Sequence, residues 1–385
     1  MTPSSLELVT STMASGGDAV ARDAAGKAVF VRGALPGERV RVSLLSDHAK
    51  YAVGRIVEVV EPSPDRIAPP CPEVARGCGA CQWQHISVAT QRRMKDQFVV
   101  ESIERAGVDC PVPGSPVALA PWAFRTTINA AVHKGRAGFN RARSHDVVPV
   151  AACLVAHPLL EELLVDGRYP GARSVLLRCG ARTGERLAVT TPTRLSLHLP
   201  DDVHPEHVHE TAAGQVWRIS ARSFFQTRAD GVDALAEIIA GAAGEMGAPA
   251  TAVDLYSGVG VFAGVLATLG WSVTAVEGSH SAVEDARHNV GRAGVTVVRA
   301  DVTTWAPVHA ELVVADPSRM GLGSAGVDVV KATGARRLVL VSCDAASLGR
   351  DAALLQGAGY RLSAVTLVDI FPHTFRVEVV TVYDR

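Results

Sequence analysis

Short runs of alternating apolar and polar residues occupy the first 60 positions. Residues 28–31, 38–45 and 52–60 show this alternation, and turn-rich stretches such as SGGDA and LPGE separate the runs. A period of two is typical of half-buried strands, and no helical period is present. Proline cannot donate to a strand ladder, so the pattern ends at a group of five prolines: Pro62, Pro64, Pro69, Pro70 and Pro72. We therefore predict a small antiparallel β-barrel as a first domain, residues 1–61.

The next segment is mixed. Residues 88–107 predict a helix of about five turns that ends at Gly107, and we expect it to pack on the domain formed by residues 222–385. Residues 112–221 combine strands and loops with weak periodicity. We assign residues 62–221 to a second, small α+β domain.

Strands and helices alternate after residue 230. A helical segment at 233–244 precedes a series of apolar strands, which helical segments separate: 251–256, 272–277, 295–301, 311–317 and 337–344. This alternation predicts a doubly wound parallel sheet, so we expect an α/β fold for a third domain, residues 222–385. The last two β-rich runs lie too close together for a crossover helix, so the final strand should run antiparallel to its neighbour.

A glycine-containing turn follows the first strand of this sheet. In residues 254–260, DLYSGVG, Gly258 and Gly260 let the backbone approach a ligand closely. Glu277 ends the next strand, where an acid can accept hydrogen bonds from both hydroxyls of a ribose. The G-x-G lacks the third glycine of a nicotinamide fingerprint and fits S-adenosylmethionine better. The alternative is a turn with a purely structural role.

Two aspartates end the third and fourth strands. Asp301 and Asp316 lie where open α/β sheets collect their ligands. The Asp-Pro step at Asp316 is similar to methyltransferase sites that face the substrate. The alternative for each aspartate is a turn or N-cap role.

Three cysteines gather in a proline- and glycine-rich loop. Cys71, Cys78 and Cys81 have the spacing C-x6-C-x2-C, which can aim three thiolates at one point. A fourth ligand would come from farther along the chain, and Cys153 is preferred over Cys110 and Cys179. Spacing alone does not separate a four-iron cluster from tetrahedral zinc, and ordinary buried cysteines are the remaining alternative.

Cys343 stands apart from this group. It lies in the sequence LVSCD at the carboxyl end of the fifth strand, on the edge that carries the glycine turn. A thiol with a pKa of about 8.5 attacks carbon only when it is partly ionised. Cys343 is thus a candidate nucleophile, with a packed core cysteine as the alternative.

Composition and charge narrow the class of protein. The 385 residues are 48% hydrophobic and 20% charged, which fits a globular protein of two to four domains and excludes disorder and fibrous repeats. No long apolar run and no leader pattern is present, so we expect a cytoplasmic protein without a membrane segment. The net charge of −1 gives no support for nucleic-acid binding, but residues 71–150 alone carry ten basic and six acidic residues.

Five motifs occur in a fixed order along the chain: C-x6-C-x2-C, DLYSGVGVF, ADPSRMGL, LVLVSCDAASLGRD and VDIFPHTFRVEVV. With them the chain resembles the RNA uracil-5-methyltransferase family (TrmA/RumA type), almost from end to end. The resemblance implies an N-terminal OB-like TRAM barrel, a class I methyltransferase domain and a [4Fe-4S] cluster held by Cys71, Cys78, Cys81 and Cys153. It also implies that S-adenosyl-L-methionine and the target base are lined by several residues: Gln226, Tyr256, Gly258, Glu277, Asp301 and Asp316.

The resemblance also implies a mechanism. Cys343 would add to C6 of uracil, Asp316 would hold the base, and Glu378 would later remove the C5 proton. The partner would be ribosomal or transfer RNA, with the target nucleotide flipped out of its stack, and we expect a monomer.

Three positions depart from the family pattern: Arg228, Asp344 and Arg376. Two other functions also remain open, one of which shares the thiol addition and the other of which the changes at Arg228 and Asp344 favour. One is an RNA cytosine-5-methyltransferase, although such enzymes lack the cysteine trio. The other is a catalytically weak RNA-binding or folding factor.

Overall fold

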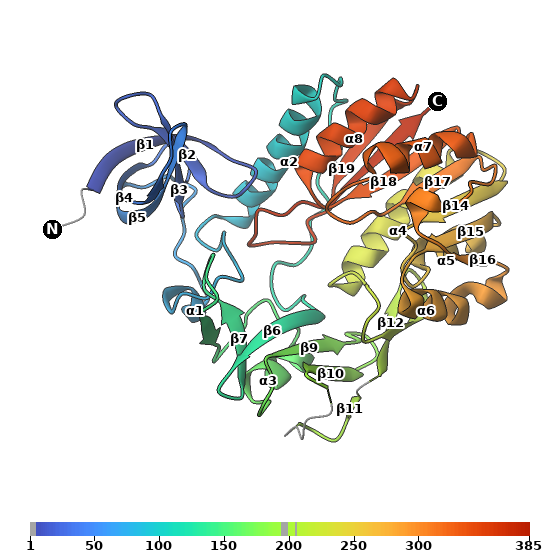
Figure 1. The fold of residues 1–385 in the computed structure, drawn as a ribbon, viewed down its shortest axis with the longest axis horizontal. Helices are drawn as coiled ribbons and strands as arrows, with labels where there is room; N and C mark the ends of the chain where they lie inside the picture. Colours follow the sequence, from blue (N-terminus) through green and yellow to red (C-terminus); the bar gives the residue numbers. More distant parts are fainter. Residues whose placement is uncertain (1–4, 194–198, 205) are drawn as a thin grey trace.

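The computed structural model describes residues 5–193, 199–204 and 206–385. Figure 1 shows the N-terminal barrel in blue at one end of the molecule and the large C-terminal sheet in orange and red at the other. Green strands of a second sheet and the connecting segments lie between and below them. Among the described helices, none is long and apolar enough to cross a bilayer.

The barrel closes in the order β1-β2-β3-β5-β4. Its strands are β1 (Ser5–Met13), β2 (Ala19–Arg22), β3 (Ala28–Arg32), β4 (Arg39–Asp47) and β5 (Tyr51–Glu61). The prediction of a barrel is confirmed, but the prediction that it is antiparallel throughout is wrong, because β3 pairs with β5 in parallel. The cause is the course of the chain after β3. It crosses to pair β4 with β1, and β5 then returns beside both β4 and β3.

Helix α2 (Val88–Arg105) connects the cysteine segment to the C-terminal domain. The side chain of Ser87 caps its amino end by accepting from Thr90 N, and Gly107 follows its carboxyl end with φ +79°. These bounds confirm the helix predicted over 88–107. The helix lies against α8 (Ala345–Gly357), where a Cβ at Gly349 would stand 2.3 Å from the carbonyl oxygen of Ser102. Only glycine therefore permits this close approach of the two helices.

The middle of the chain forms a six-stranded sheet in the order β11-β10-β9-β6-β7-β8. Its strands are β6 (Thr127–His133), β7 (Arg136–Asn140), β8 (Val147–Pro149), β9 (Ser174–Cys179), β10 (Arg186–Thr191) and β11 (Val203–His204). The short helices α1 (Pro72–Ala75) and α3 (Pro158–Val165) and the hairpin of β12 (His207–Ala212) and β13 (Gln215–Ser220) complete this region.

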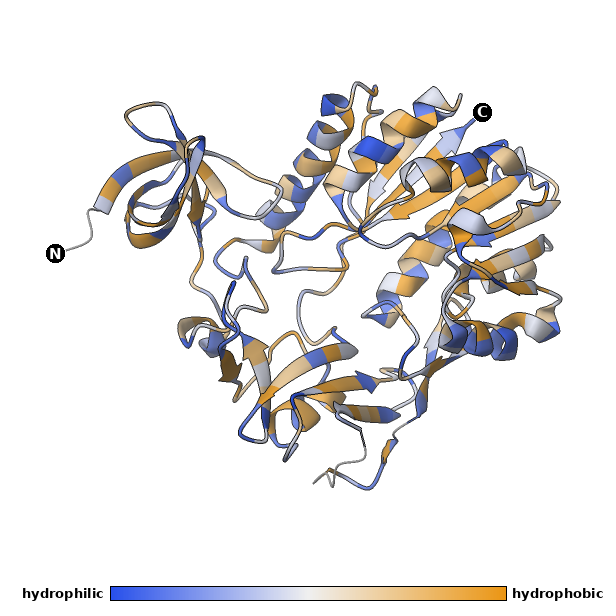
Figure 2. Ribbon diagram, viewed as in Figure 1, coloured by the Kyte–Doolittle hydropathy of each residue, from blue (hydrophilic) through white to orange (hydrophobic). Residues whose placement is uncertain are grey.

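The C-terminal sheet has the order β16-β15-β14-β17-β18-β20-β19. Its strands are β14 (Thr251–Leu255), β15 (Ser272–Glu277), β16 (Thr296–Arg299), β17 (Leu312–Ala315), β18 (Arg337–Ser342), β19 (Arg361–Leu367) and β20 (Val379–Asp384). Helices on its two faces are α4 (Ala229–Gly244), α5 (Val261–Thr268), α6 (His280–Val290), α7 (Gly323–Thr333) and α8. Figure 2 shows the central strands as hydrophobic, which their burial between helices requires.

Strand β20 runs antiparallel between β18 and β19. The predicted doubly wound sheet and the reversed last strand are both confirmed. The reversal brings the residues that precede β20 to the edge where the parallel strands end, so both kinds of strand contribute side chains to that edge.

Candidate functional site

A cavity of about 450 Å³ opens at the carboxyl edge of the C-terminal sheet. It brings together seven of the residues singled out from the sequence: Gln226, Tyr256, Gly258, Glu277, Asp316, Cys343 and Glu378. They come from the ends of β14, β15, β17 and β18, from the loop before β20 and from the segment before α4. Phe224, Arg319, Phe371 and Arg376 also line it, and of these only Arg376 stood out in the sequence, as a departure from the family pattern.

The glycine turn shapes one end of the cavity. Tyr256 and Gly258 have positive φ values of 60° and 54°, and Gly260 with φ +93° begins α5. The carboxylate of Glu277 accepts hydrogen bonds from Gly258 N at 2.9 Å and Ser279 N at 2.7 Å. The turn and the acid are therefore held together as one unit, with the acid beside the loop where an adenosyl group would lie.

Asp301 has a different environment. It is exposed, and its Oδ1 accepts from the backbone N of Thr303 at 2.8 Å as the N-cap of a short 3₁₀ turn. The Thr303 side chain also donates to Asp301 Oδ1. Both hydrogen bonds lower the pKa of Asp301, and the bond from the side chain has the larger effect. Asp301 is not among the described residues that line the cavity, so the structure shows the N-cap role for it and leaves its assignment to the cofactor a prediction.

Cys343 and Glu378 lie next to the paired ends of two neighbouring strands, β18 and β20. Ser342, the last residue of β18, pairs with Val379, the first residue of β20. Cys343 follows the one and Glu378 precedes the other, so both reach the cavity from the same end of this strand pair. Glu378 is only 2% exposed, and its Oε1 has no hydrogen-bond partner among the described atoms. A buried carboxyl oxygen without a partner is free to act on a ligand in the cavity.

Asp316 is the second acid in this group. Gln226 donates to its Oδ2 at 3.4 Å. Burial raises the pKa of Asp316 to about 7, and burial together with the charge of Asp316 raises the pKa of Glu378 well above its usual value. Two carboxyl groups in one cavity cannot both ionise readily, so one proton is held there near neutral pH.

The thiol of Cys343 feels the same surroundings. Burial, and then the negative charges of Glu378 and Asp316, raise the pKa of Cys343 to about 11. Arg319 acts in the opposite direction. The resting thiol is therefore protonated at neutral pH, beside two carboxyl groups that can take part in its proton transfer.

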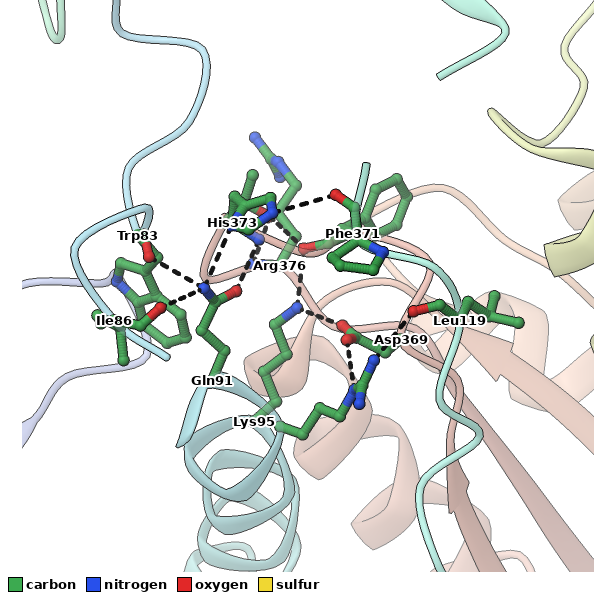
Figure 3. Close-up of polar contacts among 12 residues, drawn as sticks. Trp83, Ile86, Gln91, Lys95, Leu119, Asp369, Phe371, His373 and Arg376 are labelled. Carbon is green, nitrogen blue, oxygen red and sulfur yellow. Dashed lines mark hydrogen bonds and ion pairs between the residues drawn. The ribbon is translucent and has the colours of Figure 1, made fainter. Parts of the chain in front are cut away.

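Helix α2 and the cysteine segment contact the loop before β20, which carries Phe371, Arg376 and Glu378. Figure 3 shows Lys95 of α2 reaching the loop, where its Nζ donates to Asp369 Oδ1 and to the carbonyl of Phe371, both at 2.8 Å. Gln91 accepts from His373 N at 2.6 Å, and His373 has φ +63°. The loop is thus fixed by buried polar contacts from a helix more than 270 positions earlier in the sequence.

The barrel contacts the same loop. Gly17, in the turn between β1 and β2, has φ +87°, and a Cβ there would lie 2.6 Å from the Phe375 ring. Trp83 Nε1 donates to the carbonyl of Gly17 at 3.1 Å, and Trp83 N donates to the carbonyl of His373 at 2.9 Å. Barrel, cysteine segment and loop therefore meet at Phe375, next to Arg376.

The four predicted ligand cysteines, Cys71, Cys78, Cys81 and Cys153, line one enclosed cavity. Burial raises the pKa of Cys78, Cys81 and Cys153, so these thiols need a bound cation to become thiolates. Within the described part of the chain, no three metal-binding side chains are close enough to hold a single metal ion. A four-iron cluster differs in this respect, because each thiolate binds a separate iron. The four cysteines therefore remain the predicted ligands of a cluster, and they share one cavity.

Two of the three departures from the family pattern have structural roles. Arg228 is buried, pairs with Asp230 at 2.6 Å and lies over the Phe124 ring. Asp344 caps α8 by accepting from Ser347 N at 2.9 Å. Neither Arg228 nor Asp344 is among the described residues that line the Cys343 cavity.

The sheet order, the glycine turn and the acid that ends β15 define this domain as a class I S-adenosylmethionine-dependent methyltransferase. The TRAM domain family matches residues 8–57, which lie within the barrel. The chain is 34% identical to an uncharacterized RNA methyltransferase of Streptomyces avermitilis, with 98% of each chain covered. It is 31% identical to the 23S rRNA (uracil(1939)-C(5))-methyltransferase RlmD of Pectobacterium atrosepticum, covering 94% of this chain and 90% of that one.

Among solved structures, the fold matches the Pyrococcus abyssi tRNA (uracil-54, C5)-methyltransferase with a TM-score of 0.76. That match covers 98% of this chain and 99% of the other at 23% identity. The chain thus belongs to the RNA uracil-C5 methyltransferase family.

Proposed function

We propose that the protein methylates C5 of one uridine in RNA through a covalent adduct with Cys343. The observation that carries this proposal is the joint position of Cys343 and Glu378, on adjoining strand ends and facing one cavity. A nucleophile for C6 and a base for C5 are the two groups that the reaction needs.

The first step is addition. C5 of uracil is a weak nucleophile. In the reacting form both carboxyl groups are ionised, and Cys343 forms an S–C6 bond while its thiol proton passes to the carboxylate of Asp316, which leaves the Glu378 carboxylate for the last step. The electron pair of the C5=C6 bond then resides on C5 and the adjoining carbonyl as an enolate. The raised pKa values of Cys343 and Glu378 support a proton shared within this group rather than a thiolate in the resting enzyme.

The second step transfers the methyl group and the third releases the product. S-adenosylmethionine supplies a sulfonium methyl, to which C5 forms its new bond while S-adenosylhomocysteine leaves. Glu378 then removes the C5 proton, the C5=C6 double bond reforms, and the S–C6 bond breaks to free Cys343. Asp316, held by Gln226, orients the polar edge of the base.

The proposal includes a [4Fe-4S] cluster, and the position of four cysteines in one cavity supports it. Cys71, Cys78, Cys81 and Cys153 would hold it, and all four iron corners would then have protein ligands. A closed cluster of this kind would stabilise the segment that includes Trp83, whose backbone N donates to the carbonyl of His373 in the loop before β20. Anaerobic purification should yield about four irons per chain by this four-thiolate count, and Cys78→Ser should lose them. Stoichiometric zinc would contradict the cluster.

We further propose that the substrate is ribosomal RNA and that the enzyme works as a cytoplasmic monomer. Relatives named as 23S rRNA methyltransferases, at 31% identity and almost full coverage, favour ribosomal over transfer RNA. The basic segment 71–150 provides cations for the RNA backbone.

RNA that contains 5-fluorouridine tests the reaction. Fluorine at C5 blocks the last step, so a methylated, protein-linked RNA should persist on a denaturing gel with S-adenosylmethionine present, and should be absent with Cys343→Ala. An adduct with 5-fluorocytidine RNA instead would identify a cytosine methyltransferase. No adduct with either RNA, while both RNAs bind, would identify a binding or folding factor.

A further inference from the structure

Two arginines from distant parts of the chain line the Cys343 cavity, and the charge of a third acts on one of them. Arg319 follows the Asp316 loop, Arg376 lies two residues before Glu378, and both line the cavity. Arg125 precedes β6, and its charge also acts on Arg376. Arg319 is exposed, whereas Arg125 and Arg376 are partly buried, so the group extends from the cavity to its mouth.

None of the three side chains has an anionic partner within the described residues. In the part of the chain that the structure describes, no carboxylate lies within 4.0 Å of any of the three guanidinium groups, and none of these groups makes a side-chain hydrogen bond. The Nε of Arg125 is buried without a partner. Other arginines of the chain behave differently, since Arg92 pairs with Asp369 and Arg337 with Asp384. The group therefore keeps its hydrogen-bond donors available for a ligand.

The three cations also disfavour one another. Burial lowers the pKa of Arg376, the charge of Arg319 lowers it further, and Arg125 adds to this effect. Cys343 and Asp344 oppose the shift, but Asp344 is already engaged as the cap of α8. A bound anion would relieve this repulsion, and guanidinium groups match the geometry of phosphate oxygens.

We propose that Arg319 and Arg376 bind a backbone phosphate of the RNA next to the nucleotide that enters the Cys343 cavity, with the charge of Arg125 adding to the positive potential there. A base in the cavity brings its own flanking phosphates to the mouth, which is where Arg319 lies. This assignment rests on the proposed function in so far as the cavity takes a flipped nucleotide. Arg376 would then select and position the target nucleotide through its phosphate, without touching the reacting atoms.

The carboxylate of the methionine part of S-adenosylmethionine is the other anion that reaches this cavity. The two sources differ in what they predict. If the arginines bind a phosphate, removing one should weaken RNA binding and reduce its dependence on salt. If they bind the carboxylate, removing one should weaken the binding of S-adenosylhomocysteine.

The experiment measures binding without turnover, so it does not depend on the role of Cys343 in the chemistry. The probe is a fluorescein-labelled RNA hairpin with one uridine in its loop, and its anisotropy is followed from low to high salt. The proteins are the wild type, Arg319→Gln, Arg376→Gln and the matched control Arg292→Gln, which removes an exposed arginine from the short 3₁₀ turn that follows α6. Arg319→Gln changes an exposed side chain and leaves the fold intact, which circular dichroism checks.

The expected result is a roughly tenfold or greater loss of RNA affinity for each cavity variant, with the binding of S-adenosylhomocysteine unchanged. The slope of log K against log salt should fall by about 0.7 for each lost phosphate contact to single-stranded RNA. A methylphosphonate at the linkage beside the loop uridine should weaken binding by the wild type but not weaken it further for Arg376→Gln.

Three results would overturn the proposal. One is RNA affinity and salt slope equal to those of Arg292→Gln. Another is a loss confined to S-adenosylhomocysteine, which would identify a carboxylate site. The third is full additivity of the methylphosphonate with Arg376→Gln, which would place that guanidinium on another part of the RNA.

Discussion

Cys343 and Glu378 lie directly beyond the terminal backbone pair of two antiparallel strands, Cys343 after the end of β18 and Glu378 before the start of β20. The pair itself is Ser342 with Val379, so the thiol and the carboxyl reach the same cavity from adjacent strand ends. Strand pairing therefore sets the relative position of the two residues. The two groups act at different times in the proposed reaction, and that order can be tested.

Glu378→Gln should trap the methylated intermediate. Without the carboxylate the enzyme can still add to C6 and transfer the methyl group, but the C5 proton remains and Cys343 is not released. RNA linked to protein and carrying label from the methyl donor should accumulate on a denaturing gel. Cys343→Ala should give no linked RNA. Normal turnover by Glu378→Gln would show that another group removes the proton.

The same substitution should stabilise the protein in a pH-dependent way. Burial raises the pKa of Glu378 well above the value of 4.5 expected for an unfolded chain. The folded state therefore binds the proton more tightly, and this contribution to stability is present below pH 4.5 and is lost as the pH rises through the folded pKa. Glu378→Gln should be more stable than the wild type at pH 8, by on the order of 2 kcal/mol.

Urea unfolding at pH 8 and at pH 5 measures this difference. The gain should be smaller at pH 5, where the wild-type carboxyl is protonated in the folded state. Glu237→Gln, an exposed glutamate of α4, serves as the control and should change stability at neither pH. A gain of equal size at both pH values would show that protonation of Glu378 is not its source.

Glu277→Gln should weaken the binding of S-adenosylhomocysteine. The substitution removes the charge that accepts hydrogen bonds beside the glycine turn, and hydrogen bonds to charged groups are worth about 1.5–3 kcal/mol. Calorimetric titration should show this loss, while Glu284→Gln on the exposed face of α6 should bind normally. RNA affinity should stay unchanged, and an equal loss of both affinities would mean that Glu277 supports the fold.

Lys95→Met should destabilise the loop before β20, which runs from Asp369 to Glu378. Lys95 is 1% exposed and pairs with the fully buried Asp369 at 2.8 Å. Breaking one side of a buried pair costs roughly 3–5 kcal/mol, although Arg92 still contacts Asp369 and limits the loss. Thermal unfolding should show the effect, with the exposed Lys50→Met as the control. The kcat should fall with little change in S-adenosylhomocysteine affinity, and an unchanged kcat would separate this pair from catalysis.

Local sequence patterns predicted the parts of the structure that depend on neighbouring residues. The glycine turn at Gly258, the acid at Glu277 and the reversed β20 all follow from short runs of residues and the length of one connection. The contacts of Lys95 with Asp369 could not be predicted this way, because they join distant segments through burial. The parallel pairing of β3 with β5 likewise depends on how the barrel closes.

The cavity shows the same limit. Arg319 lies inside a motif that pointed to methyltransferases, yet no pattern in the sequence shows that its guanidinium lacks a partner. That property depends on which acids the fold places elsewhere. Asp301 illustrates the reverse case, since its position at a strand end was suggestive but its hydrogen bonds to Thr303 occupy one carboxylate oxygen.

The contact between Gly17 and the Phe375 ring has a consequence for how this chain could be recombined with others. The barrel closes on itself, as an exchangeable module would, but its first turn leaves no room for a side chain beside the loop that ends at Glu378. A barrel with a bulkier residue at this turn would push against the ring that precedes Arg376. Exchange of the barrel between relatives should therefore succeed only when the residues at positions 17 and 375 are taken from the same relative.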